Sequence, residues 1–285
     1  MANKIALVTD STAYIPKKLC EKYDLTVTPQ VLIWGEDTYQ DGVDIQPDEF
    51  YARLKTAKVM PTTSQVPPAT MKSTFEALIS KGHDVLGIFI SSKLSGTIQS
   101  AMQAKEMIGK AGEKVTYLDS KSTSMALGFQ VLAVARAIEE GANLDDAIAV
   151  AEKARENTGV FFAVDTLEFL HRGGRIGGAQ RFLGTALNMK PVLAVEDGRV
   201  EAVERIRTKN KALERVLELV TEQTQGKSPI RLASLHAYAE EEAKTLLDKA
   251  SKTMNAAESL LTTVSPVVGT HAGPGTVGLA YMVGM

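Results

Sequence analysis

The stretch 5-IALVTDSTAYIP-16 shows the pattern on which the first half of the chain is built. Its apolar run, Ile5 to Val8, is short and ends in small polar residues, which is typical of a buried strand with a polar carboxyl end. Pro16 then falls near the first turn of an expected helix. A strand, a polar turn and a helix together form the repeating unit of parallel α/β sheets.

The same alternation of strands and helices continues to about residue 157. Strands are predicted at 25–34, 84–91 and 114–119, and helices at 47–57, after Pro67-Pro68, and at 97–110, 125–140 and 144–157. Pro29 should bend the strand at 25–34 or place it at an edge, and 35–42 is expected to be a turn-rich connection. We therefore predict a first α/β domain over residues 1–158 with a mainly parallel sheet.

The second half begins again at 159-GVFFAV-164, another short apolar run. Further strands are predicted at 191–195, 199–206, 230–236, 257–264 and 277–283, with helices at 209–224 and 239–253. Asp197-Gly198 predicts a hairpin between two neighbouring strands. We therefore expect a second α/β domain over residues 159–285 with a mixed sheet, packed tightly on the first.

Composition narrows the class of protein. The chain has 285 residues, 44% of them hydrophobic and 23% charged, as in soluble globular proteins. A formal net charge of -2 gives no global attraction to nucleic acid. Cys20 is the one cysteine, the start lacks a signal peptide, and no apolar run is long enough to span a membrane. The expected location is the cytoplasm.

Three clusters of small polar residues stand out in the first half. They are 9-TDST-12, 62-TTSQ-65 and 91-SSKLSGT-97, and the first and third each lie between a predicted strand and a predicted helix. In open parallel sheets, ligands bind outside the carboxyl ends of the strands, where free N–H groups and hydroxyls can hold an anion. Each cluster could instead be a helix cap or a loop turn. Their recurrence favours a polar, anion-binding rim.

The segment 167-LEFLHRGGRIGGAQ-180 surrounds Arg175 with glycines. Glycines let the backbone approach a ligand closely, and Arg175 could bind a carboxylate or phosphate with two parallel hydrogen bonds. The glycines could equally end one helix and begin the next, with exposed arginines. In 205-RIRTKNK-211, three cations at a spacing of two would share one face if the strand continued. This is either a solvated face or a docking surface for an acidic partner or a phosphoryl donor.

The segment 269-GTHAGPGTVG-278 contains the pattern G-x-G-x-x-G. A dinucleotide site needs a helix after this pattern and an acidic residue about 20 positions later, but only seven residues follow Gly278 and none is acidic. The stretch is therefore not a dinucleotide fingerprint. His271, with little apolar bulk around it, is expected on a polar loop, where a protonated ring nitrogen could donate to an anion. The Walker A, H-E-x-x-H and G-x-S-x-G motifs are also absent.

Taken together, these motifs resemble the DegV family in order and over essentially the whole chain. The matching pieces are 9-TDST-12, 62-TTSQ-65, 92-SKLSGTIQSA-101, 172-RGGRIG-177, 189-MKPVL-193, 205-RIRTKN-210 and 271-HAGPGTVG-278. One departure is 65-QVPP-68, which adds a residue to a loop where many members have Gln-Pro-Ser or Gln-Pro-Ala.

The resemblance implies a lipid-binding protein that buries a fatty acid between or beneath two α/β domains. By transfer of the motifs, Thr63 and Ser95 hydrogen-bond the carboxylate, Gly96 offers its N–H, and His271 lies close by. Arg175 acts at the head group or supports phosphoryl transfer, and Arg207 belongs to a partner surface. Some members are binding subunits of a fatty acid kinase. They present the acid to a separate ATP-using subunit, and the acyl phosphate serves phospholipid synthesis, where an acyltransferase would be a further partner. No other cofactor is implied.

Two other functions stay open at this point. Ser95 and His271 could be the nucleophile and base of a free-standing hydrolase or acyltransferase. The glycine-rich loops could alternatively serve a sugar- or nucleotide-phosphate enzyme.

Overall fold

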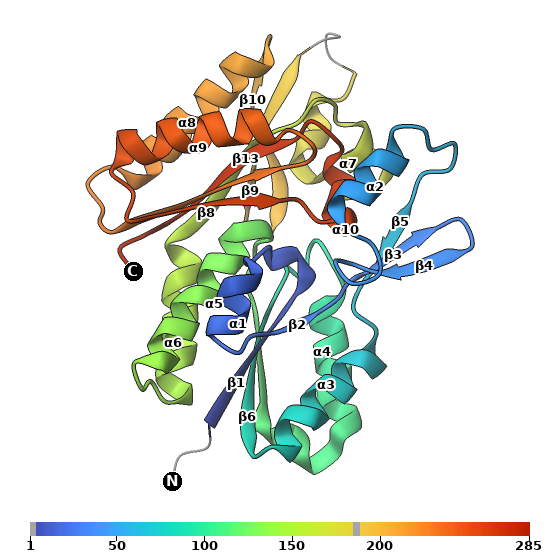
Figure 1. The fold of residues 1–285 in the computed structure, drawn as a ribbon, viewed down its shortest axis with the longest axis vertical. Coiled ribbons are helices and arrows are strands. Elements are labelled where there is room, and N and C mark those ends of the chain that lie inside the picture. The colour runs from blue at the N-terminus through green and yellow to red at the C-terminus, as the bar shows by residue number, and fades with distance from the viewer. Residues whose placement is uncertain (1–3, 185–188) are drawn as a thin grey trace.

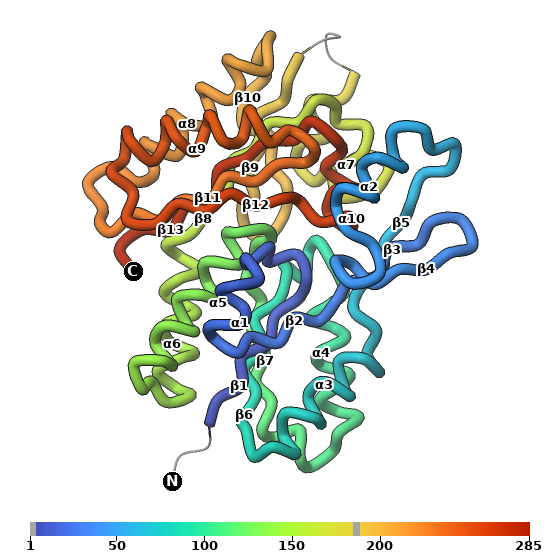
Figure 2. Tube along the Cα trace, in the orientation of Figure 1, coloured from blue at the N-terminus to red at the C-terminus, as the bar shows by residue number. Residues whose placement is uncertain are grey.

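Figure 1 shows two α/β parts stacked on each other in the computed structural model, which describes residues 4–184 and 189–285. Within these residues, a four-stranded sheet lies in the first part and a six-stranded sheet in the second. The chain passes between the parts from α6 (Leu144–Glu156) to β8 (Thr158–Ala163), as the tube in Figure 2 shows. The fold class expected from the sequence is confirmed. The domain boundary at residue 158 stays a prediction.

All strands of the first sheet are parallel. In order across the sheet they are β2 (Thr26–Thr28), β1 (Lys4–Asp10), β6 (His83–Phe89) and β7 (Val115–Asp119). Neighbouring residues of a strand point to opposite faces, so Leu7 packs against α5 (Ser124–Glu139) and Val8 packs against α3 (Pro68–Ser80) and α4 (Thr97–Ile108). The carboxyl ends of these strands point toward the second part (Figure 1).

The second sheet is mixed, because β11 and β12 are parallel whereas its other neighbouring strands are antiparallel. In order across the sheet its strands are β10 (Arg199–Ile206), β9 (Lys190–Glu196), β8, β13 (Val277–Val283), β11 (Ile230–His236) and β12 (Glu258–Thr263). Helices α8 (Lys209–Thr224) and α9 (Glu240–Met254) cover the face to which Phe161 points. Phe162 points to the opposite face, where the cavity described below lies.

The hairpin predicted at Asp197-Gly198 joins β9 to β10, with Glu196 paired to Arg199. Asp197 has φ 47° and Gly198 has φ 82°, so both turn residues are left-handed. A two-residue turn with two positive φ values matches the twist of the flanking strands, which explains the Asp-Gly sequence.

A small antiparallel sheet corrects the expectation for residues 25–42. The single strand predicted at 25–34 is broken at Pro29, which has no N–H to donate, and its halves join different sheets. The second half is β3 (Val31–Trp34), which pairs with β4 (Asp37–Gln40) and with β5 (Thr62–Ser64). The turn-rich connection expected at 35–42 therefore contains a strand, and the cluster 62-TTSQ-65 lies mostly in another.

Several short elements connect these layers. They are the 3₁₀ helices η1 (Ser11–Ala13), η2 (Gly109–Lys114) and η3 (Gly177–Phe182), and the helices α1 (Lys17–Lys22), α2 (Pro47–Leu54), α7 (Glu168–Arg172) and α10 (Pro266–Ala272). Helix α10 was not expected from the sequence. Helix α2 belongs to the first half of the chain but lies against α10 of the second half, and Tyr51 donates to the carbonyl of Val264 at 3.1 Å.

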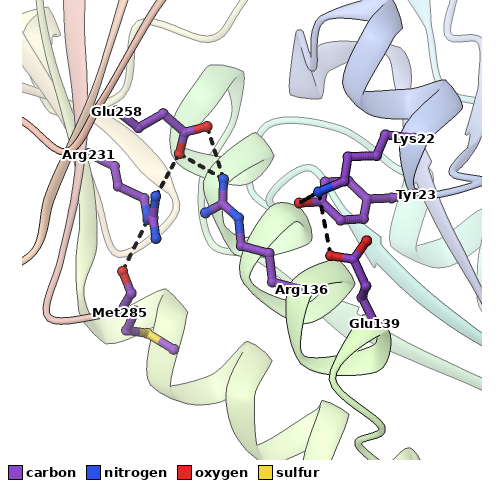
Figure 3. A network of polar contacts seen from close by, with 7 residues as sticks. All are labelled: Lys22, Tyr23, Arg136, Glu139, Arg231, Glu258 and Met285. Carbon is purple, nitrogen blue, oxygen red and sulfur yellow. Dashed lines mark hydrogen bonds and ion pairs between the residues drawn. The ribbon is translucent and has the colours of Figure 1, made fainter.

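The two parts share one apolar core and one ionic joint. The shared core combines Phe50 and Met125 of the first half with Val160 and Ala233 of the second. On the side of α5, Arg136 and Arg231 both bind Glu258, at 2.7 and 3.0 Å (Figure 3). These contacts hold α5 against the second sheet.

Candidate functional site

A cavity lies between the two sheets at the carboxyl ends of the parallel strands. Thr12 follows β1, Ser95 follows β6 and Thr123 follows β7, and all three line it. The second part supplies an apolar wall that includes Val160, Phe162, Leu170, Val195 and Leu235. The empty space, counted with its open mouth, is about 1020 Å³, which is at the upper end of the range for small-molecule sites. The cavity therefore has a polar floor and an apolar roof.

All five residues predicted to bind or support a ligand head group line this cavity. They are Thr63, Ser95, Gly96, Arg175 and His271. Thr63, Arg175 and His271 also line a second pocket outside the first. The sequence motifs that lie far apart in the chain are thus gathered at one place, which we call the cavity mouth.

Thr63 and His271 form a direct hydrogen bond across the interface of the two parts. The distance between Thr63 Oγ1 and His271 Nε2 is 2.7 Å, and which atom donates depends on the tautomer of the ring. The other ring nitrogen, Nδ1, is buried and has no hydrogen-bond partner among the described residues. The Nδ1 edge of the ring lies against Gly173, where an added Cβ would collide with Nδ1.

The position and charge of His271 correct the sequence-based expectation. The residue lies in the last turn of α10 rather than on a polar loop. Burial and, to a smaller extent, the positive charge of Arg175 lower its pKa to about 4. His271 is therefore neutral at neutral pH, and only one ring nitrogen can donate.

Ser95 belongs to a separate hydrogen-bonded group. Its hydroxyl lies 3.0 Å from Thr97 Oγ1, and it donates at 3.4 Å to Gln30 Oε1. Gln30 is 2% exposed and its amide donates to Thr97 Oγ1 at 2.8 Å. Ser95 and His271 thus have different partners, so the structure does not form the serine–histidine pair that a hydrolase would need.

Gly96 leaves room for the side chain of Gln65. A Cβ at Gly96 would lie 2.4 Å from Gln65 Oε1, so the amide rests on the glycine where α4 begins. Val66 is fully buried and α3 begins after Pro67. A buried apolar side chain thus anchors the segment 65–68.

Arg175 is held at the mouth by backbone carbonyls. Its Nε donates to the carbonyl of Leu94 at 3.0 Å, and Nη1 donates to that of Gly173 at 2.7 Å. These bonds use only part of the five N–H donors of a guanidinium. A fixed positive charge with free donors remains beside Thr63 and His271.

The glycines of 273-GPGTVG-278 have structural roles. Gly273, with φ 78°, ends α10 and packs against Phe169, and Gly275, with φ 81°, packs against Asp165. Gly278 faces Phe162, where a Cβ would be 2.8 Å from Phe162 Cβ. The stretch therefore turns the chain from α10 into β13, and Thr276 within it lines the cavity.

The basic run at 205–211 does not form one strand face. Strand β10 ends at Ile206, and Lys209 begins α8, where it pairs with Glu242 at 3.2 Å. Arg205 lies over the ring of Phe182. Arg207 is exposed in the turn between β10 and α8. Its assignment to a partner surface stays a prediction.

Sequence reasoning missed three residues of the site. The sequence predicts one strand over 25–34, whereas Gln30 lies between two strands, β2 and β3, and its place in the site was therefore not predicted. Thr123 and Ser124 follow β7 in 120-SKSTS-124, so the strand-end rule used for the other clusters would have found them.

No group of three or more His, Cys, Asp or Glu within residues 4–184 and 189–285 is arranged to hold a metal ion. None of the helices there has the length and apolar character needed to cross a membrane.

Comparison with known proteins places this geometry in a family. A profile described as "Uncharacterised protein, DegV family" matches residues 4–283. A DegV domain-containing protein of Clostridium perfringens is 35% identical over 279 residues, which cover 97% of this chain and 98% of that protein.

Solved structures share the whole fold. The structure of a fatty-acid-binding DegV family protein from Thermus thermophilus has a TM-score of 0.92 to this chain and 36% sequence identity, and the match covers 98% of this chain and 99% of that one. A stearic acid-binding protein of Eubacterium ventriosum has a TM-score of 0.90 and 26% identity, covering 100% of this chain and 99% of that one.

Proposed function

This chain belongs to the DegV family, and from that premise we propose that it binds a long-chain fatty acid in the cavity, with the carboxylate at the mouth. The observation that carries the proposal is a largely apolar cavity whose mouth gathers Thr63, Ser95, Arg175 and His271. Its similarity to the fatty-acid-binding protein of Thermus thermophilus and the stearic acid-binding protein of Eubacterium ventriosum supports it.

The energetics of burial fit a ligand with one charged end and a long apolar chain. Each buried methylene contributes about 0.8 kcal/mol, so a deep apolar wall favours a long chain. A carboxylate buried without partners would cost several kcal/mol and must therefore be hydrogen-bonded. The hydroxyls of Thr63 and Ser95, together with the guanidinium of Arg175, are suitable donors at the same place.

The neutral His271 orients the Thr63 hydroxyl in this proposal. An orphaned buried N–H is rarer than an orphaned acceptor, so the proton is best placed on Nε2, with Nδ1 left as a bare acceptor. His271 then donates to Thr63 Oγ1 across 2.7 Å. The hydroxyl proton of Thr63 is thereby free to point at the carboxylate.

Transfer of a phosphoryl group to the bound acid is the second part of the proposal. The chain would present the carboxylate to a separate ATP-using kinase subunit, and an acyltransferase of phospholipid synthesis would use the acyl phosphate. The outer pocket beside Thr63, Arg175 and His271 supports this, because it leaves the head group reachable from outside. The exposed Arg207 would lie on the surface used by the kinase subunit, and the cytoplasm would be the location.

Native mass spectrometry of the freshly purified chain tests the ligand assignment. We expect a co-purified fatty acid that is lost on mild delipidation and regained on incubation with stearic acid. A bound nucleotide without lipid would contradict the proposal. Turnover of acyl esters by the chain alone, lost in Ser95→Ala, would replace the binding function with a hydrolase.

Hydroxylamine trapping of acyl phosphate tests the presentation to a kinase. The loaded chain is incubated with ATP and the candidate kinase subunit from the same organism. Acyl hydroxamate should form only when chain, kinase subunit and ATP are all present. Formation without the chain would show that the kinase subunit needs no carrier.

A further inference from the structure

The cavity has a second group of hydroxyl side chains, in residues that do not line the outer pocket. Thr123 and Ser124 begin α5, and both line the cavity but not the outer pocket that shares the mouth residues. Tyr14 lines the same cavity and follows η1, which packs on α5. Figure 1 shows α5 on one side of the interface, and α10 and β5, which carry His271 and Thr63, on the other. We call Tyr14, Thr123 and Ser124 the deep hydroxyl site.

The hydroxyls of all three residues are buried without partners. Thr123 Oγ1 and Ser124 Oγ have no hydrogen bond among the described residues, and Ser124 is 4% exposed. Buried polar atoms in proteins almost always find a partner, since an unpaired one loses its hydration without compensation. Both of these residues border empty space, so the partner can come from a ligand.

The backbone at Ser124 indicates that the placement of this side chain is enforced. Ser124 has φ 56°, a left-handed conformation that costs energy for a residue with a side chain. Thr123, at the N-cap position, uses its side chain for no capping hydrogen bond. A threonine at a helix start usually caps the helix, and here its hydroxyl is left to the cavity.

Tyr14 adds a donor that stays protonated. Burial raises the pKa of its phenol well above the ordinary value, so the group is neutral at physiological pH. The deep hydroxyl site therefore offers neutral donors and acceptors and no charge. It would bind an alcohol oxygen better than a second carboxylate, whose charge nothing among these three side chains would balance.

We propose that the deep hydroxyl site binds a hydroxyl group on the acyl chain, so that the protein takes hydroxylated long-chain fatty acids. This rests on the proposed function, because the carboxylate at the mouth fixes where along the chain that hydroxyl must lie. An unsubstituted chain leaves Thr123 and Ser124 unpaired, whereas an alcohol can donate to one and accept from the other.

Binding of C18 acids to the delipidated full chain tests the proposal. Stearic acid is compared with a series of monohydroxystearic acids in which the hydroxyl moves along the chain. An apolar pocket would bind every hydroxy acid more weakly, because the alcohol would lose its hydration. We expect at least one positional isomer to bind about tenfold more tightly than stearic acid, as one or two well-placed hydrogen bonds allow.

The double variant Thr123→Val Ser124→Ala should abolish this preference, so that the affinity of the best isomer relative to stearic acid falls from about tenfold to about equal or below. Ser100→Ala is the matched control, because Ser100 also has a buried, unpartnered hydroxyl but does not line the cavity. Ser100→Ala should keep the preference. Should the double variant fail to fold, each single variant is measured against the same isomer.

Stearic acid that binds with no hydroxy isomer bound more tightly would overturn this inference and leave the proposed function intact. A preference that survives in the double variant would overturn it too. If neither stearic acid nor any hydroxy acid binds, both the proposed function and this inference fall.

Discussion

The two parts of the molecule meet at two polar places that differ in whether protein groups balance the charges there. At the ionic joint, Glu258 binds Arg136 and Arg231, and Arg231 also donates to the carbonyl of Met285 at 3.1 Å (Figure 3). At the cavity mouth, His271 bonds to Thr63 through one ring nitrogen and leaves the other unpaired.

The difference separates a structural contact from a binding site. The carboxylate of Glu258 has its charge balanced by protein groups, so it needs nothing from outside. The mouth gathers donors and the positive charge of Arg175, but no acidic side chain lines it or the cavity in the described residues. We therefore expect changes at the joint to alter stability, and changes at the mouth to alter ligand affinity.

Glu258→Ala should have the largest effect, lowering the free energy of unfolding by about 3 kcal/mol, because it leaves two half-buried arginines unpaired. Glu139→Ala is the matched control, since the pair of Glu139 with Lys22 in Figure 3 has side chains 53% and 52% exposed. Denaturant unfolding of delipidated protein measures both. An equal decrease in the free energy of unfolding of the two variants would show that the ionic joint stabilises the protein no more than an exposed ion pair does.

Thr63→Ala and Ser95→Ala should each weaken fatty acid binding by about 2 kcal/mol, roughly 30-fold, because each removes a hydrogen bond to a charged group. Stability without ligand should change little in Ser95→Ala, whereas Thr63→Ala also leaves Nε2 of His271 without its partner and should be somewhat less stable. Ser92→Ala, which lies in the same loop as Ser95 but bonds to Asp119, serves as the control. Unchanged lipid retention in the Thr63→Ala Ser95→Ala double variant would contradict the placement of the carboxylate.

Gly173→Ala should weaken ligand binding by about tenfold through His271. Its φ of -74° accepts alanine, so the one strong conflict is the new Cβ against the His271 ring. A double-mutant cycle with His271→Ala isolates the cause. Isothermal titration should show that Gly173→Ala does not weaken ligand binding further in a protein that already carries His271→Ala. If Gly173→Ala weakens binding equally with and without His271, its effect does not act through that ring.

The ionisation of His271 should make the free protein less stable in mild acid. Its pKa falls from an ordinary 6.5 to about 4 on folding, so between these values the unfolded chain binds more protons. Stability therefore decreases as the pH falls through this window. Burial raises the pKa of Asp41 to about 6, and this contributes in the opposite sense between pH 3.8 and 6.

Comparison of wild type with His271→Gln separates the two groups. Between pH 7 and pH 5 the wild type should lose about 1 kcal/mol more stability than the variant, after allowance for partial solvent exposure. Chemical unfolding at both pH values measures this. Identical pH dependence in the two proteins would show that His271 is not the group responsible.

Arg207→Ala should have the smallest effect on the lipid, changing its affinity by no more than about twofold, because this exposed side chain does not line the cavity. Formation of acyl phosphate with the kinase subunit should fall instead. Both are measured on the same loaded sample. Loss of the lipid from this variant would show that Arg207 is needed for lipid binding, which would contradict its assignment to a separate partner surface.

Much of the fold and of the mouth was predictable from the sequence. Short apolar runs with polar ends predicted the strands, and Asp197-Gly198 predicted its hairpin, since these depend on local propensity and period. The mouth residues came from motifs shared with the DegV family. The small sheet around β3 was missed because its strands pair across distant segments, and three- or four-residue strands carry little periodic signal.

The sequence by itself determined the strand–helix order, the hairpin, and the set of polar residues available to a ligand. Tertiary structure alone decided that His271 is a neutral group bonded to Thr63, because its pKa depends on burial and on Arg175, which come from segments distant in the chain. It also decided that the hydroxyl of Ser124 is unpaired inside the cavity while Glu258 is fully paired outside it. Local sequence specifies which atoms can donate or accept, but packing determines which of them have a partner.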